Sequence, residues 1–425
     1  MKPLDTKRLF IPVFALGILL LSCNKDVEQY PDSGAPSPGS QPAIAASIAA
    51  NANYSLYNAI IAKSGLASKL SDSTIKLTAF VPGNAAVKQA INLLTSGAIP
   101  VAAPDATFLG FIGSENFTTA TAQGMVSYNT VPQAITFGSL PGNFPNFQYP
   151  TLINPAPTVS ALLRLTTFPS NRNGNFVNNV PITNASGTLV GNGVIYETGA
   201  VVIPPQKFLW DRINTDANLT YLKAAVARAD SGTAAPGFLT GVLQNIGANL
   251  TVFAPTDDAF KATLYNLAFP SVRATIFAQA KAAGASDAVA NAAADANAPA
   301  QTTALVGSTA VFSNPLLFPV LTAERVKGVV VYHILGNRAF LNNFATTQTN
   351  VPTLLNGAVP AHPGVGLQAT LTGPMVTAAS VKGAVNATAA TITINPTPEP
   401  GGSSDQHYVN GVIHKINQVL LPQSF

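Results

Sequence analysis

Two segments decide the architecture of the chain: Leu77-Thr-Ala-Phe-Val-Pro-Gly-Asn84 and Leu250-Thr-Val-Phe-Ala-Pro-Thr-Asp257. In each, a short run of β-branched, aromatic and aliphatic residues predicts a strand. The proline that follows cannot donate to a β-ladder, so it ends the strand, and Thr256 or Asp257 can then cap a helix. Asn84 is expected to do the same in the earlier segment. A strand followed at once by a helix therefore occurs twice, which indicates an internal repeat.

Further segments recur in the same order. Met125-Val-Ser-Tyr-Asn129 is echoed by Val329-Val-Val-Tyr-His333, and Asn192-Gly-Val-Ile195 returns as Asn410-Gly-Val-Ile413. The two Asn-Gly pairs lie between β-prone runs and predict hairpins. Apolar residues before each strand recur at spacings of three and four, so we expect each copy to begin with helices.

Helices combined with mostly antiparallel strands predict an α+β fold. We expect a first copy at residues 43–206 and a second copy at residues 207–425. The second copy is longer, and much of its excess lies where alanine occupies 13 of the 23 positions from 278 to 300. Because alanine is the best helix former, we expect an added helix or helical hairpin near residues 278–310. A disordered loop is the alternative.

The start of the chain is typical of a secretory signal peptide at residues 1–22. Three cations precede an apolar run at residues 9–21, which as a helix would span about 20 Å and fall short of the hydrocarbon core of about 30 Å. Leu20-Leu21-Ser22-Cys23 is similar to the lipobox of bacterial lipoproteins. This similarity implies cleavage before Cys23 and acylation of its thiol. An unmodified thiol is the alternative.

Residues 23–42 are rich in proline, glycine and serine. Such a composition cannot build a core, so we expect a flexible tether that spans roughly 25 Å. With the lipid on Cys23, this tether would hold the folded part clear of the lipid headgroups. The expected location is therefore the cell envelope, as an outer-membrane lipoprotein exposed at the cell surface.

Composition excludes several classes of protein. The chain is 47% hydrophobic and 9% charged, which is enough apolar material for a core. A single cysteine excludes a disulfide framework and a zinc site built on paired cysteines. The formal net charge of +4 includes three cations and one aspartate within residues 1–22, so the mature chain is nearly neutral. Without a basic cluster, nucleic acid is not an expected partner.

No catalytic pattern stands out. The sequence has no Gly-x-Ser-x-Gly turn and no glycine-rich phosphate loop. His407 and His414 are seven residues apart, without the i, i+4 spacing of a helical metal pair. We therefore expect no enzyme activity, no metal and no cofactor. A pair of carboxylates brought together only by folding stays open at this point.

The repeated segments carry a resemblance to a known family. The stretch Thr251-Val-Phe-Ala-Pro-Thr-Asp-Asp-Ala-Phe260, the pair Tyr332-His333, and Asn410-Gly-Val-Ile-His414 with Pro422 resemble the fasciclin (FAS1) domain family. The resemblance implies two tandem domains, each a β-wedge with packed helices. It also implies extracellular adhesion through binding of protein or glycan.

The first copy departs from the family pattern. It has Val81-Pro-Gly-Asn84 in place of the usual Ala-Pro-Thr-Asn, Asn129 in place of the histidine, and Tyr196 where the second copy has His414. It therefore reads as a degenerate copy. For the same reason, the resemblance does not imply adhesion through residues 128–129 of the first copy.

Candidate ligand-binding residues come from the resemblance alone. In some family members adhesion maps near the tyrosine-histidine segment, which makes Tyr332 and His333 the candidates here. The residues themselves favour a structural role, because apolar neighbours on both sides predict a buried histidine bonded to the backbone.

Three functions remain open. The first is a lipid-anchored cell-surface adhesion protein that binds an extracellular protein or polysaccharide. The alternatives are an accessory glycan-binding lipoprotein of an outer-membrane uptake system, and a structural envelope protein.

Overall fold

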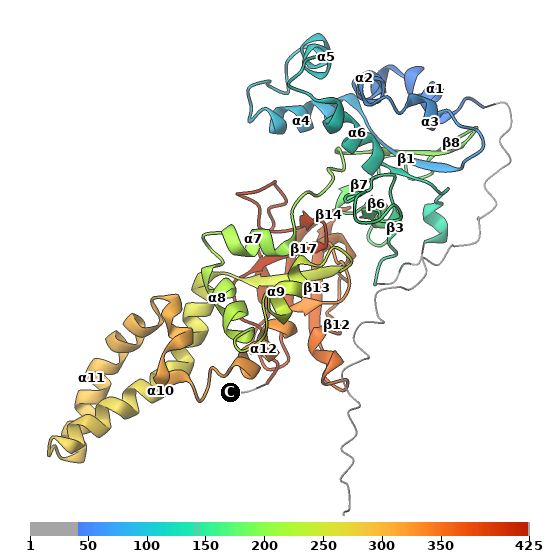
Figure 1. The fold of residues 1–425 in the computed structure, drawn as a ribbon. Helices are drawn as coiled ribbons and strands as arrows, with labels where there is room; N and C mark the ends of the chain where they lie inside the picture. The colour runs from blue at the N-terminus through green and yellow to red at the C-terminus, as the bar shows by residue number, and fades with distance from the viewer. Residues whose placement is uncertain (1–40, 141, 143, 424–425) are drawn as a thin grey trace, which may run out of the picture. The chain divides into compact units, whose positions relative to one another are not determined.

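The computed structural model describes residues 41–140, 142 and 144–423 (Figure 1). The predicted signal peptide, Cys23 and nearly all of the predicted tether lie outside the described residues. Both copies of the repeat belong to one unit of the structure.

The first copy begins with helices that surround a short central strand. Its helices are α1 (Ile44–Ala49), α2 (Ser55–Ser64), α3 (Ala67–Leu70), α4 (Asn84–Leu94), α5 (Asp105–Gly113) and α6 (Thr119–Tyr128). Its strands are β1 (Leu77–Pro82), β2 (Thr130–Val131), β3 (Tyr149–Pro150), β4 (Thr166–Thr167), β5 (Pro169–Ser170), β6 (Phe176–Val177), β7 (Val180–Pro181), β8 (Thr188–Val190) and β9 (Gly193–Thr198). Short 3-10 helices are η1 (Ala52–Tyr54) and η2 (Phe137–Ser139).

The second copy follows the same order with longer elements. Its helices are α7 (Leu209–Thr215), α8 (Thr220–Ala229), α9 (Phe238–Gln244), α10 (Asp257–Ala282), α11 (Asp287–Val306) and α12 (Ala323–Tyr332). Its strands are β10 (Leu250–Pro255), β11 (Ile334–Leu335), β12 (Thr349–Val351), β13 (Val365–Thr372), β14 (Met375–Lys382), β15 (Ala390–Ile392), β16 (Gln406–Tyr408) and β17 (Gly411–Ile416). Its 3-10 helices are η3 (Thr309–Ser313), η4 (Pro315–Leu317), η5 (Leu341–Asn343) and η6 (Leu354–Gly357).

The pairing of the strands is the same in both copies. Strand β1 pairs antiparallel with β2 and parallel with β9, and β10 pairs in the same way with β11 and β17. In the parallel pairs, Leu77 lies opposite Gly193 and Leu250 opposite Gly411. The hairpins β8–β9 and β16–β17 also occupy matching positions. The internal repeat and the α+β class are therefore confirmed.

The copies differ in how far the sheet extends. In the first copy the strand order is β2-β1-β9-β8, with two small separate sheets, β3–β4 and β5–β6–β7. In the second copy the order is β11-β10-β17-β15-β14-β13-β12, and β16 also pairs with β17. Most of these pairings are antiparallel, as the sequence predicted.

The alanine-rich segment is helical rather than disordered. It forms the end of α10 and most of α11, which run side by side as a hairpin (Figure 1). Val272 and Ile276 of α10 pack against Ala294 and Ala298 of α11. Alanines at a spacing of four present a smooth face, which lets the two helix axes approach closely.

The residues that end and begin helices explain part of the local fold. Gly65 ends α2 with a positive φ of 71°, which a glycine adopts without strain. Thr256 accepts from the backbone N–H of Ala259 at 3.4 Å and caps α10, as expected. Asn84 does not cap the helix that follows it. Its Oδ1 accepts from Leu56 N–H at 3.0 Å instead, because the start of α2 lies beside it and has unpaired N–H groups.

The hydrophobic core of each copy has two parts. In one part the helices pack against the central strand, and in the other the remaining strands and loops pack against it. All six residues of β1 and of β10 are buried. Because successive side chains of a strand point to opposite faces, each central strand contributes to both parts of its core. The segments that resemble the fasciclin pattern lie around this strand.

Candidate functional site

Tyr332 lies in the last turn of α12 and is fully buried. Its hydroxyl donates to the Gly364 carbonyl at 2.6 Å and accepts from Ala384 N–H at 2.8 Å. Its ring contacts His362 edge-on, with the ring centres 5.0 Å apart. Burial raises the pKa of the phenol, and the bond from Ala384 partly offsets this. Tyr332 therefore ties the end of the helix to the loops before β13 and after β14.

His333 follows directly and is 2% exposed. Its Nδ1 lies 2.7 Å from the Val329 carbonyl, so this nitrogen carries the proton and donates it. Leu420 N–H donates to the other ring nitrogen, Nε2, at 2.8 Å. Burial lowers the pKa of His333 to about 4, with the Val329 carbonyl acting in the opposite direction. The ring is neutral at pH 7, and both of its nitrogens are used inside the chain.

The candidate pair is therefore interior in this structure. Neither side chain presents a polar atom at the surface for a ligand. A role of these residues in binding stays a prediction, and any such role would act through the backbone and loops that they hold.

In the first copy, Asn129 makes the bonds that His333 makes in the second. Its Nδ2 donates to the Met125 carbonyl at 2.8 Å and to the Val202 carbonyl at 2.8 Å. Val202 N–H donates to its Oδ1 at 3.3 Å. The contacts to the preceding helical turn and to the closing segment of the copy are thus both kept. The departure from the family pattern leaves this local structure intact.

Tyr196 of the first copy and His414 of the second form another pair of equivalent residues that differ in type but keep a bond to a backbone carbonyl. His414 Nε2 donates to the Ala339 carbonyl at 2.9 Å, and the Tyr196 hydroxyl of the first copy donates to the Ile135 carbonyl at 3.0 Å. Asp405 N–H donates to His414 Nδ1 at 3.1 Å, which fixes the neutral tautomer. Burial lowers the pKa of His414 to about 4, partly offset by the bond to Ala339.

Asp405 is a nearly buried carboxyl beside this histidine. Its Oδ1 accepts from Leu341 N–H at 2.9 Å and lies 3.9 Å from His414 Nδ1. Burial raises the pKa of Asp405 to about 7, and the Leu341 bond lowers it only in part. The carboxyl therefore changes charge near neutral pH.

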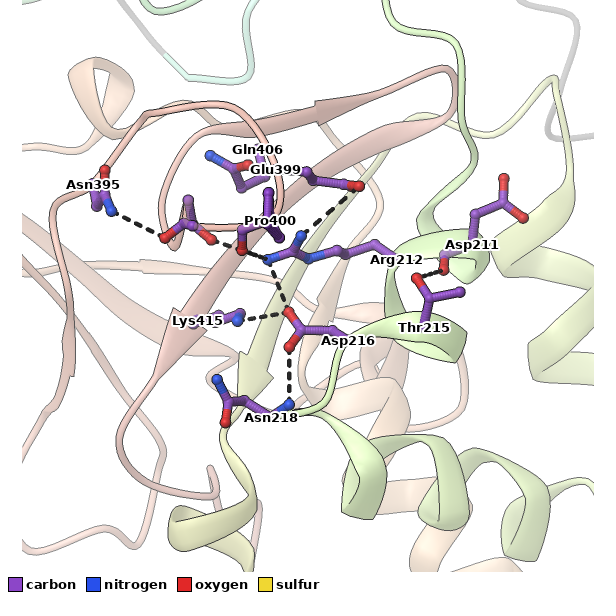
Figure 2. A network of polar contacts seen from close by, with 12 residues as sticks. Asp211, Arg212, Thr215, Asp216, Asn218, Asn395, Glu399, Pro400, Gln406 and Lys415 are labelled. Atoms are coloured by element: carbon purple, nitrogen blue, oxygen red, sulfur yellow. Dashed lines mark hydrogen bonds and ion pairs between the residues drawn. The ribbon is translucent and has the colours of Figure 1, made fainter. Parts of the chain in front are cut away.

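Ionic contacts gather where α7 meets the loop before β16 (Figure 2). Arg212 Nη2 lies 2.8 Å from Asp216 Oδ2, and Lys415 Nζ of β17 lies 2.6 Å from the same oxygen. Arg212 also donates to the carbonyls of Pro400 and Gly402, each at 3.1 Å. Burial raises the pKa of Asp216, but the bonds from Lys415 and from a backbone N–H, with the nearby cations, outweigh it and lower the pKa.

Glu399 extends this network toward the solvent. Its Oε2 lies 2.7 Å from Lys207 Nζ and 3.8 Å from Arg212 Nη1, and its Oε1 accepts from the Tyr408 hydroxyl. Burial raises the pKa of Glu399, but the bonds from Lys207 and Tyr408 and the charge of Arg212 lower it overall. Arg212 thus joins two carboxylates that the sequence separates widely. Both are held ionised by cations, which suits them to fixing the loop at residues 395–405.

Arg338 is a buried cation whose bonds go to neutral groups. Its Nε donates to Asn249 Oδ1 at 3.0 Å, its Nη1 lies 2.6 Å from His407 Nε2, and its Nη2 donates to the Val409 carbonyl at 3.1 Å. The ring of Phe168 lies 4.7 Å from the guanidinium carbon. Burial lowers the pKa of Arg338 to about 10. Burial first, and the charge of Arg338 second, hold the pKa of His407 well below its usual value.

The described residues hold no metal-binding cluster and no helix suited to span a membrane. No cluster of three or more histidine, cysteine, aspartate or glutamate side chains within them could hold a metal ion. No helix in that part of the chain combines the length and apolar character that crossing a membrane requires.

Comparison with known proteins finds likenesses among solved structures. The chain is similar to the structure of a FAS1 domain pair from the insect cell adhesion molecule fasciclin I, with a TM-score of 0.31 and 11% sequence identity. The match covers 86% of this chain and 95% of that chain. No family model matches the sequence, and no curated protein does.

The polar network of Arg212 was not predicted from the sequence. Asp216, Glu399 and Lys415 lie up to about two hundred residues apart, and no local motif links them. The repeated segments aligned Asn129 with His333 as equivalent positions. The alignment did not reveal that an amide can supply the same bonds as the imidazole.

Proposed function

We propose that this protein is a cell-surface adhesion protein of the fasciclin type, held in the outer membrane by a lipid on Cys23. Its two copies would bind an extracellular protein or polysaccharide. The observation that supports this best is the meeting of the fasciclin-like segments: β10 lies between β11, which follows Tyr332-His333, and β17, which begins at Gly411. Residues far apart in the sequence thus form one module.

We also propose that the role is binding without catalysis. The carboxylates that folding brings together, Asp216 and Glu399, are each neutralised by cations at ion-pair distance. A glycosidase needs one carboxyl held protonated as the acid. The lowered pKa values of Asp216 and Glu399 do not suit that role. Asp405 has a raised pKa, but it is nearly buried and its carboxyl is bonded to the Leu341 backbone.

Within this proposal, Tyr332 and His333 shape the binding region rather than touch the ligand. Their side chains form hydrogen bonds with the backbone of Gly364, Ala384 and Leu420 and so fix these loop positions. The contact surface for the ligand would then lie on the loops that these bonds fix.

A binding array tests the proposal. The mature chain carrying Cys23→Ser would be applied to immobilised matrix proteins and polysaccharides without detergent. Saturable binding to extended polymers or matrix proteins supports adhesion. Tight binding confined to one defined oligosaccharide would favour the uptake function, and the absence of binding to every surface would favour a structural envelope role.

A further inference from the structure

A small apolar pocket lies in the second copy between α8, α10, α12 and the closing segment of the chain. Its cavity measures about 40 Å³. Aliphatic and aromatic side chains form nearly all of its wall, among them Phe260, Leu264, Leu321, Val326 and Val419. A cavity of this size encloses roughly the volume of three water molecules, but water needs polar partners that this wall does not supply. The pocket is therefore suited to an apolar group.

Two polar residues line the pocket, and only one has polar atoms to offer. The Thr263 hydroxyl donates to the Ala259 carbonyl of its own helix at 3.1 Å. Arg325, on α12, is exposed, and its Nη1 donates to the Pro319 carbonyl at 3.2 Å. This bond leaves Nε and Nη2, the edge of a guanidinium that matches the two oxygens of a carboxylate.

A second cation stands beside the same segment. Arg228 Nε donates to the Leu321 carbonyl at 2.9 Å, and its guanidinium lies 5.2 Å from the ring centre of Phe318. Among the described residues, neither Arg228 nor Arg325 forms an ion pair with a carboxylate. Two arginines that form no ion pair with an acid in the described part of the chain thus bond to carbonyls of the segment from Phe318 to Leu321.

Two acids lie near these arginines in the sequence, and neither forms an ion pair with them among the described residues. Glu324 precedes Arg325 on α12 and is exposed to solvent. Asp230, which follows α8, accepts from Leu239 N–H at 2.8 Å and from Thr240 N–H at 3.0 Å, so its oxygens are already used. Arg325 is therefore the one charged residue among those that line the pocket.

We propose that this pocket binds an amphipathic anion, an aliphatic carboxylate whose tail enters the cavity and whose head pairs with Arg325. The cavity encloses the last two or three carbons, and the rest of the tail lies along half-buried Leu267 and Val329 at the rim. Burial of the tail and the ion pair both contribute to affinity. This site is independent of the proposed adhesive function and could fail without affecting it.

Octanoate is the probe that tests the proposal, with the mature Cys23→Ser chain in detergent-free buffer. Isothermal titration calorimetry measures the affinity, and methyl NMR of labelled leucine and valine shows where the probe binds. We expect saturable one-to-one binding and shifts of the Leu264, Val326 and Val329 methyl signals. 1-Octanol has the same tail without the charge and should bind about tenfold more weakly. Octylammonium, with the opposite charge, should not bind.

Two kinds of variant separate the tail from the head. Arg325→Gln should weaken octanoate about tenfold and leave octanol unchanged. Val329→Phe fills the cavity from α12 and should abolish binding of both probes. Thr263→Leu fills it from α10 and serves if Val329→Phe unfolds, which a thermal melt would show. Arg164→Gln is the matched control, because Arg164 is an exposed arginine of the first copy that also donates only to backbone carbonyls.

Two results would contradict binding of an aliphatic carboxylate in this pocket. Binding of octanoate that does not saturate would overturn the pocket as its site. Equal affinity of octanoate for the unchanged chain and for both Val329→Phe and Thr263→Leu would do the same. Octanol that binds as tightly as octanoate, with no effect of Arg325→Gln, would overturn the preference for an anion.

Discussion

Asn129 and His333 occupy equivalent places in the two copies and bond to the same two parts of the fold. Each reaches back to the carbonyl four residues earlier, Met125 or Val329, and each pairs with the closing segment of its copy. What these positions share is a set of hydrogen bonds rather than a residue type. This relationship assigns His333 a structural role and gives a direct way to test it.

Replacing His333 with asparagine should be mild, because the first copy shows an amide making the same contacts. We expect His333→Asn to lower the free energy of unfolding by less than about 1 kcal/mol. His333→Ala should lower it by about 3 kcal/mol, since it leaves Leu420 N–H unpaired and opens a cavity. Urea unfolding measures both. Equal losses in the two variants would contradict the structural equivalence, and so would unchanged stability together with lost ligand binding.

Acid should destabilise the protein through its buried histidines. The pKa of His333 and of His414 is about 4 in the folded chain, against about 6.5 in an unfolded chain. Between these values the unfolded chain binds more protons, so stability falls as the pH drops from about 6.5 to 4. His333→Asn should reduce this fall, as measured by melting temperature against pH. A variant whose profile parallels that of the unchanged chain would contradict the assignment.

Asp405 should act in the opposite direction. Its pKa is about 7 in the folded chain, against about 3.9 when unfolded. The folded chain therefore binds more protons between these values, and the stability contributed by Asp405 is lost as the pH rises toward 7 and above. Asp405→Asn keeps the acceptor for Leu341 N–H without the charge. It should be more stable than the unchanged chain at pH 8, and a loss of stability there would count against the buried carboxyl.

The contribution of the ionic network around Arg212 to the free energy of unfolding should depend little on salt concentration. Asp216→Asn leaves Arg212 and Lys415 without their shared carboxylate, which we expect to cost about 3 kcal/mol of unfolding free energy. Asp258→Asn is the control, because Asp258 pairs with Lys261 at an exposed site and should change stability by about 0.5 kcal/mol or less. Chemical denaturation with urea in low and high salt measures both. A strong salt dependence of the Asp216 effect would show that the pair is solvated rather than buried.

The sequence predicted the repeat and the fold class because both rest on local signals. Strand propensity from Leu77 and from Leu250 was enough to find the central strands, although Pro82 and Pro255 are the last residues of these strands rather than the residues that follow them. The Asn-Gly pairs located hairpins, although the structure places Gly193 and Gly411 as the first strand residues rather than in the turns. Alanine content likewise predicted the added helices.

The sequence could not predict contacts that the fold alone creates. Arg212 and Glu399 lie near opposite ends of the second copy in the sequence, yet their side chains are at ion-pair distance. Neither residue lies in a motif. Asn84 illustrates the same limit at short range. Its position after a strand suggested a cap for its own helix, but the packing of α2 beside it gave its oxygen a nearer partner, Leu56 N–H.

The most direct test of the proposed function is attachment under flow of cells that make either the unchanged protein or its Cys23→Ser variant at equal levels. Surfaces would be coated with the matrix protein or polysaccharide that the binding array identifies. We predict that the unchanged protein stays in the outer membrane and promotes attachment, while the variant is released from the membrane and attachment falls to that of cells lacking the protein. Attachment that persists with the variant, or that never depended on the protein, would contradict a lipid-tethered adhesion protein.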